Sequence, residues 1–245
     1  YIKGLFRELG EVEFSEHHSN HGTEISYPVI VGKFMERCGV PVGDKSLQKF
    51  GLPQSIINGS KEIKFAYLEE LIPEDGNFHA DEKGQAKFQW SRASVLYAGS
   101  KRGTYDIKYD VPNELREFLS IHGKKTAIRI DGEEKSQYTS LRYSKLEKLS
   151  KSDNAQEKNS ATRFIKIIKN NPNQLLLDEV AMCKTLGINI RSGPRNINLY
   201  RSGRVSVQWE AITRGQKDAE TWAKIAPPAD IRKYELVKRW IKSTP

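Results

Sequence analysis

The sequence has few cysteines and no long apolar run. Its two cysteines, Cys38 and Cys183, lie far apart and lack the Cys/His spacing of a zinc site. This argues against a disulfide framework and favours a reducing, intracellular setting (cytoplasmic, nucleoid or organellar) over secretion. No apolar run approaches the roughly 20 residues that cross a bilayer, and the amino terminus shows no signal-peptide pattern, so no membrane partner is expected. Because the chain begins at Tyr1, within helical spacing, we expect further sequence upstream.

Acidic residues are outnumbered by basic ones. The chain of 245 residues has 31 Asp and Glu against 40 Lys and Arg, a formal charge of +9. An excess of positive charge favours polyanionic partners, because binding releases their counterions. The alternative is a soluble protein that is merely basic. With 37% hydrophobic residues the chain is long enough to bury a core in one or two domains.

Motifs of several enzyme classes are also missing. The sequence contains no nucleotide-phosphate loop, no Ser/His nucleophile pair and no redox cysteine motif. Three histidines, His17, His18 and His21, lie in a polar turn between strand-like residues 11–14 and 23–27. No cysteine or later histidine completes a ligand set, so we interpret the turn as a solvated loop of a hairpin.

Apolar periodicity predicts the remaining elements. Helical spacing is found at residues 1–9, 28–39, about 61–73, 173–186 and about 231–241. Strand patterns occur at residues 85–90, 105–109, 197–200 and 205–209, the last two joined by a hairpin turn. Residues 124–171 differ in character, since Lys, Ser, Glu and Asn dominate and residues 145–160 show no aliphatic stripe. We interpret this stretch as an insertion, partly mobile.

Two segments share a pattern that is typical of one family. Residues 1–10 read YIKGLFRELG and residues 67–76 read YLEELIPEDG, and both are followed by strand-forming residues. Each resembles the signature helix of the LAGLIDADG homing endonucleases. The residues before the second copy (39–45, Pro53, Ile56 and 61–65) look like the linker of archaeal and intein-borne members. Residues 175–188 and 212–222 resemble the helix and the turn that finish a repeat, so the similarity covers most of the chain except roughly 100–170.

The resemblance implies an α+β fold of two αββαββα repeats. In the family the signature helices pack against each other, and two antiparallel sheets form a pseudo-twofold saddle over DNA. On this chain the first, short repeat with its linker would span residues 1–66. The second would span 67–245, with an insertion at about 100–170. The short separation of Gly10 and Gly76 indicates a trimmed first repeat, and the implied state is a monomer with internal pseudo-twofold symmetry.

Strand alternation would place polar side chains on a face that can contact nucleic acid. Inward-facing residues of the strand at 85–90 would be Ala86, Phe88 and Trp90. Tyr200 would accompany the polar residues of the later hairpin. The candidate nucleic-acid-binding residues are Gln85, Lys87, Gln89, Arg92, Asn196, Asn198, Arg201 and Arg204. The alternative for each is the solvated face of an ordinary antiparallel strand.

The family places a metal-binding acid before the final glycine of each signature helix, where the metal activates water for phosphodiester hydrolysis. The resemblance puts Leu9 and Asp75 at these positions, so one acid is present and one is missing. Asp75 with Glu74 could hold Mg²⁺, although Asp75 could instead cap the helix end. Neighbouring acids that could substitute for Leu9 are Glu8, Glu11 and Glu13. The candidate catalytic residues are Asp75, Glu74 and Glu8, with Asp75 as the metal ligand.

A second departure concerns the contact between the two signature helices. Glu70 stands where the family has glycine or alanine for close helix approach, whereas Gly4 keeps the small residue in the first copy. A buried, ionised Glu70 would be costly without a partner. We therefore expect the helix interface to be loosened or locally rearranged.

Three functions remain open. The first is a Mg²⁺-dependent, site-specific DNA endonuclease of the intron- or intein-encoded kind. The second is a relative that binds double-stranded DNA or structured RNA without cutting, as a regulator or an intron maturase would. Leu9 and Glu70 fit the second more easily than the first. The third is a structural or protein-interaction module, for which the basic excess would be incidental.

Overall fold

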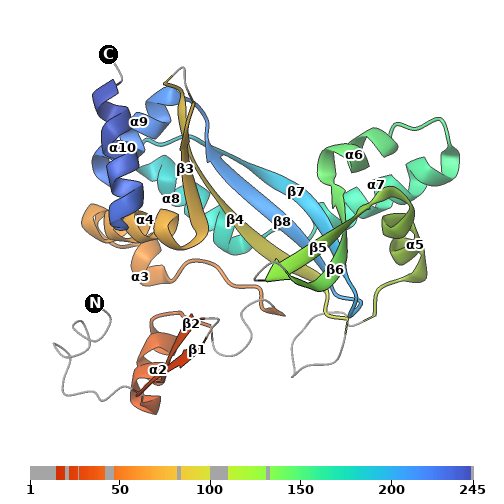
Figure 1. Ribbon diagram of the computed structural model, residues 1–245, viewed down its shortest axis with the longest axis horizontal. Helices are drawn as coiled ribbons and strands as arrows, with labels where there is room; N and C mark the ends of the chain where they lie inside the picture. The colour runs from red at the N-terminus through yellow and green to blue at the C-terminus, as the bar shows by residue number, and fades with distance from the viewer. Residues whose placement is uncertain are drawn as a thin grey trace.

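The computed structural model describes residues 15–19, 22–26, 28–41, 47–81, 84–99, 110–130 and 133–243. It is a mixed α+β fold built on a curled antiparallel sheet of six strands in the order β3-β4-β8-β7-β6-β5, and β1 and β2 form a separate hairpin (Figure 1). The α+β class expected from the sequence is therefore confirmed. In the described part of the chain, no helix combines the length and apolarity that crossing a membrane requires.

The elements follow one another in mixed order. The strands are β1 (Ser15–Ser19), β2 (Gly22–Ser26), β3 (Gly76–Ala80), β4 (Ala86–Tyr97), β5 (Lys124–Ile130), β6 (Glu133–Arg142), β7 (Ile190–Tyr200) and β8 (Val205–Thr213). The helices are α2 (Val29–Arg37), α3 (Gln54–Ile57), α4 (Lys61–Asp75), α5 (Asn113–His122), α6 (Tyr143–Leu149), α7 (Ala155–Lys169), α8 (Gln174–Thr185), α9 (Gln216–Ile225) and α10 (Ile231–Ser243).

One face of the six-stranded sheet is buried under helices. Phe88 and Trp90 of β4 are almost fully buried and pack on Trp222 of α9, with ring centroids 5.2 and 5.3 Å apart. At the other end of the sheet, Leu141 of β6 packs with residues of α5, α6 and α7. Figure 1 shows these two helix groups at opposite ends of the sheet. Both groups cover the same face. The opposite face, called the open face below, is the one that these helices leave uncovered in the described part of the chain, and Leu47 packs on Val95 of β4 at one end of it.

Helix α4 ends in a turn that its own backbone cannot complete. Pro73 has no N–H, so the carbonyl of Glu69 four residues earlier lacks its helical donor. The N–H of Ala229, just before α10, donates to that carbonyl at 3.0 Å. The carboxyl-terminal segment thus completes the backbone hydrogen bonds of α4.

Lys233 of α10 caps the same helix end. Its Nζ donates to the carbonyls of Ile72, Pro73 and Gly76 at 2.6, 2.9 and 3.0 Å. An ammonium group has three protons, so all of them are used here. A positive charge at a helix carboxyl terminus also interacts favourably with the helix dipole. Together with Ala229, Lys233 fixes the position of the last turn of α4.

Replacing Lys233 with methionine is expected to lower the free energy of unfolding by about 2–3 kcal/mol, because three partly buried carbonyls lose a charged donor. Chemical denaturation followed by circular dichroism measures this. The matched control is Lys242→Met in the exposed last turn of the same helix, with an expected change within about 0.5 kcal/mol. Equal effects of the two substitutions would contradict the capping role.

The stretch interpreted as an insertion is folded. Residues 145–160, where no aliphatic stripe was found, belong largely to α6 and α7, which bury residues such as Leu146, Ala161, Phe164 and Ile168. The buried face of α7 includes the small, polar Ser160, so residues 145–160 show no continuous aliphatic stripe although most of them are helical. The expected strand at 105–109 lies outside the described residues.

The two strands of the amino-terminal hairpin do not have the bounds predicted from the sequence. They are Ser15–Ser19 and Gly22–Ser26, so His17 and His18 lie in β1 and not in a loop, while His21 is outside the described residues. The helix predicted at 28–39 is α2, in which Val29 and Phe34 are 75% and 50% exposed.

Candidate nucleic-acid interface and an acidic cluster at the end of α4

The open sheet face carries polar side chains at alternate positions of β4. Lys87 and Gln89 are partly exposed there, whereas Ala86, Phe88 and Trp90 are buried. This is the alternation expected from the sequence. Gln85 is exposed immediately before the strand.

The neighbouring strands continue the same face. Asn196 and Asn198 of β7 lie opposite Gln208 and Ser206 of β8, and the intervening Ile197 is buried. Side chains directly opposite one another in an antiparallel pair point to the same face. The predicted placement of Asn196 and Asn198 with the polar residues is therefore confirmed.

Hydrogen bonds hold several of these side chains in place. Glu210 accepts from Gln89 at 2.7 Å and from Arg195 at 2.6 Å, and Asn196 donates to Gln208 at 3.1 Å. Arg195 sits at a bulge in β7, where the register with β8 shifts. These hydrogen bonds between side chains fix the orientation of the polar groups in the unbound protein.

The β7–β8 hairpin presents two further arginines. Arg201 is exposed in the turn and Arg204 is partly buried, with the N–H of Tyr200 donating to the carbonyl of Arg204 at 2.9 Å. Gly203 has φ +80°, in the left-handed region that glycine adopts without strain. A Cβ atom added at Gly99 would lie 2.3 Å from the backbone nitrogen of Arg204. Gly99, just after β4, therefore lies close to this turn.

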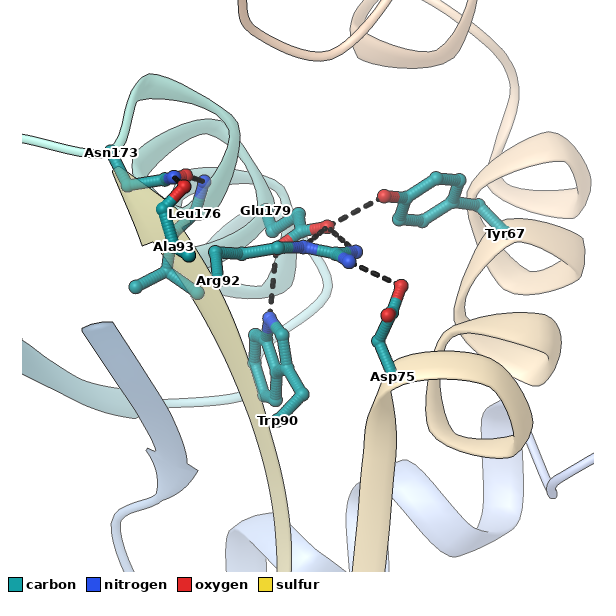
Figure 2. Close-up of polar contacts among 8 residues, drawn as sticks. All are labelled: Tyr67, Asp75, Trp90, Arg92, Ala93, Asn173, Leu176 and Glu179. Atoms are coloured by element: carbon teal, nitrogen blue, oxygen red, sulfur yellow. Dashed lines mark hydrogen bonds and ion pairs between the residues drawn. The ribbon is translucent and has the colours of Figure 1, made fainter. Parts of the chain in front are cut away.

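Arg92 does not share the open face. It lies opposite Trp209, on the helix-covered side of the sheet, and its side chain is 14% exposed. Figure 2 shows its guanidinium between the carboxylates of Glu179 and Asp75. Nη2 donates to Glu179 Oε1 at 2.6 Å, and Nη1 donates to Asp75 Oδ2. We therefore assign Arg92 to an internal ion-pair cluster and not to the sheet surface.

Glu179 of α8 is the centre of this cluster and is fully buried. It accepts hydrogen bonds from the hydroxyl of Tyr67 at 2.6 Å and from Trp90 Nε1 at 2.8 Å, besides those from Arg92 (Figure 2). A buried carboxylate is tolerated only when its charge and lone pairs are satisfied in this way.

The cluster shifts the ionisation of its members. Burial opposes the charge on Arg92, but the hydrogen bonds and charge of Glu179 outweigh this effect and raise the pKa of Arg92 above its usual range. Burial, with the negative charge of Glu179, also raises the pKa of Tyr67 well above its ordinary value. Tyr67 is thus a hydrogen-bond donor and Arg92 a cation at any physiological pH.

Asp75 is the last residue of α4 and lies directly before β3. Its side chain is 50% exposed and Glu74 beside it is exposed. Mg²⁺ in proteins is commonly held by one or two carboxylates, with water and phosphate oxygens supplying the other ligands. Asp75 and Glu74 carry carboxylate oxygens of the kind that Mg²⁺ takes, but Asp75 is paired with Arg92, and the side chains of adjacent helix residues point about 100° apart. Within the described residues, no group of three or more His, Cys, Asp or Glu side chains could hold a metal.

The segment that resembles the first signature helix, residues 1–10, lies outside the described part of the chain. It includes Gly4, Glu8, Leu9 and Gly10, so the predicted contact between the two helices stays a prediction. Glu70 is exposed on α4, and the described structure does not show the burial considered from the sequence. Glu11 and Glu13 also lie outside the described residues.

Sequence reasoning missed Glu179 and the arginines of β7. Glu179 interrupts the apolar stripe of α8 between Leu176 and Cys183, and a charged residue inside such a stripe indicates a buried ion pair. Arg191 and Arg195 are exposed on β7 but precede the short strand predicted at 197–200. The longer strand places them on the sheet.

Comparisons with models of protein families, with curated proteins and with solved structures found no match.

Proposed function

We propose that the chain binds double-stranded DNA across the open face of its sheet, as a LAGLIDADG-type protein. The observation that carries this proposal is the contrast between the two faces: one is covered by helices and the other presents Lys87, Gln89, Asn196 and basic residues of β7. Amides and guanidinium groups on strands can hydrogen-bond base edges in the major groove, and ammonium groups contact phosphates.

The order of elements supports the same proposal. Helix α4 is followed by β3 and β4, and α8 is followed by β7, β8 and α9. These elements have the order αββαββα, and their strands are neighbours in the sheet as β3-β4-β8-β7. The segment between β4 and α8 accounts for the remaining elements of residues 67–225. This is the arrangement that the resemblance implies for one repeat with an insertion.

Binding to duplex DNA is expected to weaken steeply as salt concentration rises, because bound counterions are released on association. Fluorescence anisotropy with a labelled random-sequence duplex measures the slope of log Kd against log salt. Lys87→Ala should lower the magnitude of that slope by about 1. Lys224→Ala, on the exposed surface of α9, is the matched control and should leave it unchanged.

A flat salt dependence would contradict the proposal and favour a protein-interaction module. The same titration with a structured RNA in competition distinguishes the two nucleic acids. Tighter binding of RNA would move the function to that of a maturase or RNA regulator, and tighter binding of duplex DNA supports the proposal as stated.

A second candidate activity is Mg²⁺-dependent cleavage of the bound duplex. It is favoured by the half-exposed carboxylate of Asp75 at the end of α4, where the resemblance places a metal ligand. When bound there, Mg²⁺ would supply activation of water and stabilisation of the leaving oxygen. Conversion of supercoiled to nicked plasmid, with a random-sequence insert pool and with Mg²⁺ or chelator, tests this activity. Binding without conversion supports the DNA-binding function alone.

A further inference from the structure

The segment between β4 and α8 contributes two strands to the main sheet. Its β5–β6 hairpin pairs with β7 through β6, from Tyr138 opposite Tyr200 to Arg142 opposite Asn196. The sheet therefore continues from β7 to β6 and then β5, so the described side chains of these two strands on the side of Asn198 belong to the same face (Figure 1).

The described side chains of β5 and β6 on the open face are polar, like those of β7 beside them. Ser140 donates to Asn198 at 2.8 Å and lies opposite Lys124 of β5, which is exposed. The rings of Tyr138 and Tyr200 stack with centroids 5.5 Å apart. The inserted strands thus present hydroxyl, aromatic and cationic groups beside those of β7.

A groove of about 640 Å³ lies where the inserted segment meets β7. Three exposed arginines line it, Arg142 from β6 with Arg191 and Arg195 from β7. Its acids are Glu147 and Glu210, and Glu210 is already paired with Arg195. Among the described residues, neither Arg142 nor Arg191 has a carboxylate at ion-pair distance. Both guanidinium groups are thus available to an external anion.

A duplex backbone fits this arrangement better than a compact ligand. The groove is open, and its arginines lie on two neighbouring strands, β6 and β7, beside the polar side chains of the open face. Arginine binds phosphate oxygens through two parallel hydrogen bonds, and phosphate contacts set the register of a protein on DNA. Continuity with the face proposed for DNA makes the same duplex the occupant.

We propose that the β5–β6 hairpin is a second part of the DNA-binding surface, in which Arg142 and Lys124 contact phosphates beyond the stretch covered by β3, β4, β8 and β7. This inference rests on the proposed function. Two added strands at about 4.8 Å spacing widen the face by roughly 10 Å, which corresponds to about 3 base pairs. The inserted segment therefore lengthens the bound site on one side.

Charge reversal at Arg142 tests the inference in the full chain. On a single duplex selected from a random-sequence pool by binding to the parent protein, Arg142→Glu is expected to weaken binding about tenfold at 0.1 M salt and to shorten the hydroxyl-radical footprint by about 3 base pairs on one flank only. Lys124→Glu, at another exposed position, should shorten the same flank. The matched control is Lys166→Glu on the exposed surface of α7, on the helix side of the sheet, which changes the net charge equally.

The outcomes separate the two proposals. If the parent protein binds duplex DNA and both hairpin variants keep its affinity and footprint, the hairpin does not contact DNA and only the further inference fails. If the parent does not bind duplex DNA at all, the proposed function fails with it. A general loss of affinity that Lys166→Glu shares would indicate net charge and would also overturn the hairpin contact.

Discussion

Replacing Arg92 with leucine is expected to lower the free energy of unfolding by about 3–5 kcal/mol, because the substitution leaves Glu179 buried without its cation. Glu179 is fully buried, and Tyr67 and Trp90 would remain as its neutral donors. Neutral hydrogen bonds offset only part of the cost of burying a charge. Urea denaturation followed by circular dichroism measures the change.

Two further variants identify the cause. Arg195→Leu breaks an ion pair on the sheet surface whose side chains are 50% and 26% exposed, and its expected cost is at most about 1 kcal/mol. The double substitution Arg92→Leu with Glu179→Leu removes both buried charges and should recover most of the stability lost by the single substitution. A double variant as unstable as the single one would show that lost packing, and not an unpaired charge, causes the effect.

The parts of this fold that sequence predicted are those set by local pattern. Alternation around Phe88 places Lys87 and Gln89 on the open face, and the periodicity of residues 173–186 predicts α8. Asn173 is the N-cap of that helix, accepting from the N–H of Leu176 at 2.9 Å. Helix α4 likewise spans Lys61–Asp75, two residues beyond its predicted end.

The parts that sequence did not predict depend on pairing between distant residues. Leu141 and Ile197 lie opposite each other in neighbouring strands although α6, α7 and α8 separate them in the chain. Local periodicity contains no information on such register, which the turn and the buried face decide together. The same holds for the contact between Arg92 and Glu179. Arg92 was predicted to bind DNA, but the structure places it in the ion-pair cluster.

Asp75→Asn is expected to abolish Mg²⁺-dependent nicking, if the parent has this activity, and to leave duplex binding within about threefold of the parent value. Mutation of residues that only hydrogen-bond to metal ligands lowers metal affinity or activity about 10- to 100-fold. Removing a direct ligand should therefore lower the nicking rate by more than about 100-fold. Nicking of supercoiled plasmid and anisotropy on the same preparations measure the two effects.

The structure explains why binding and fold should survive this substitution. Asp75 is half exposed, so its ion pair with Arg92 contributes about 1 kcal/mol or less, and asparagine keeps an oxygen that can accept from the guanidinium. Arg92 also remains held by Glu179. Glu117→Gln, at an exposed position of α5, removes the same charge away from this site and is the matched control. Equal loss of binding and nicking in Asp75→Asn would show that Asp75 has a structural role through its ion pair with Arg92 and is not a metal ligand.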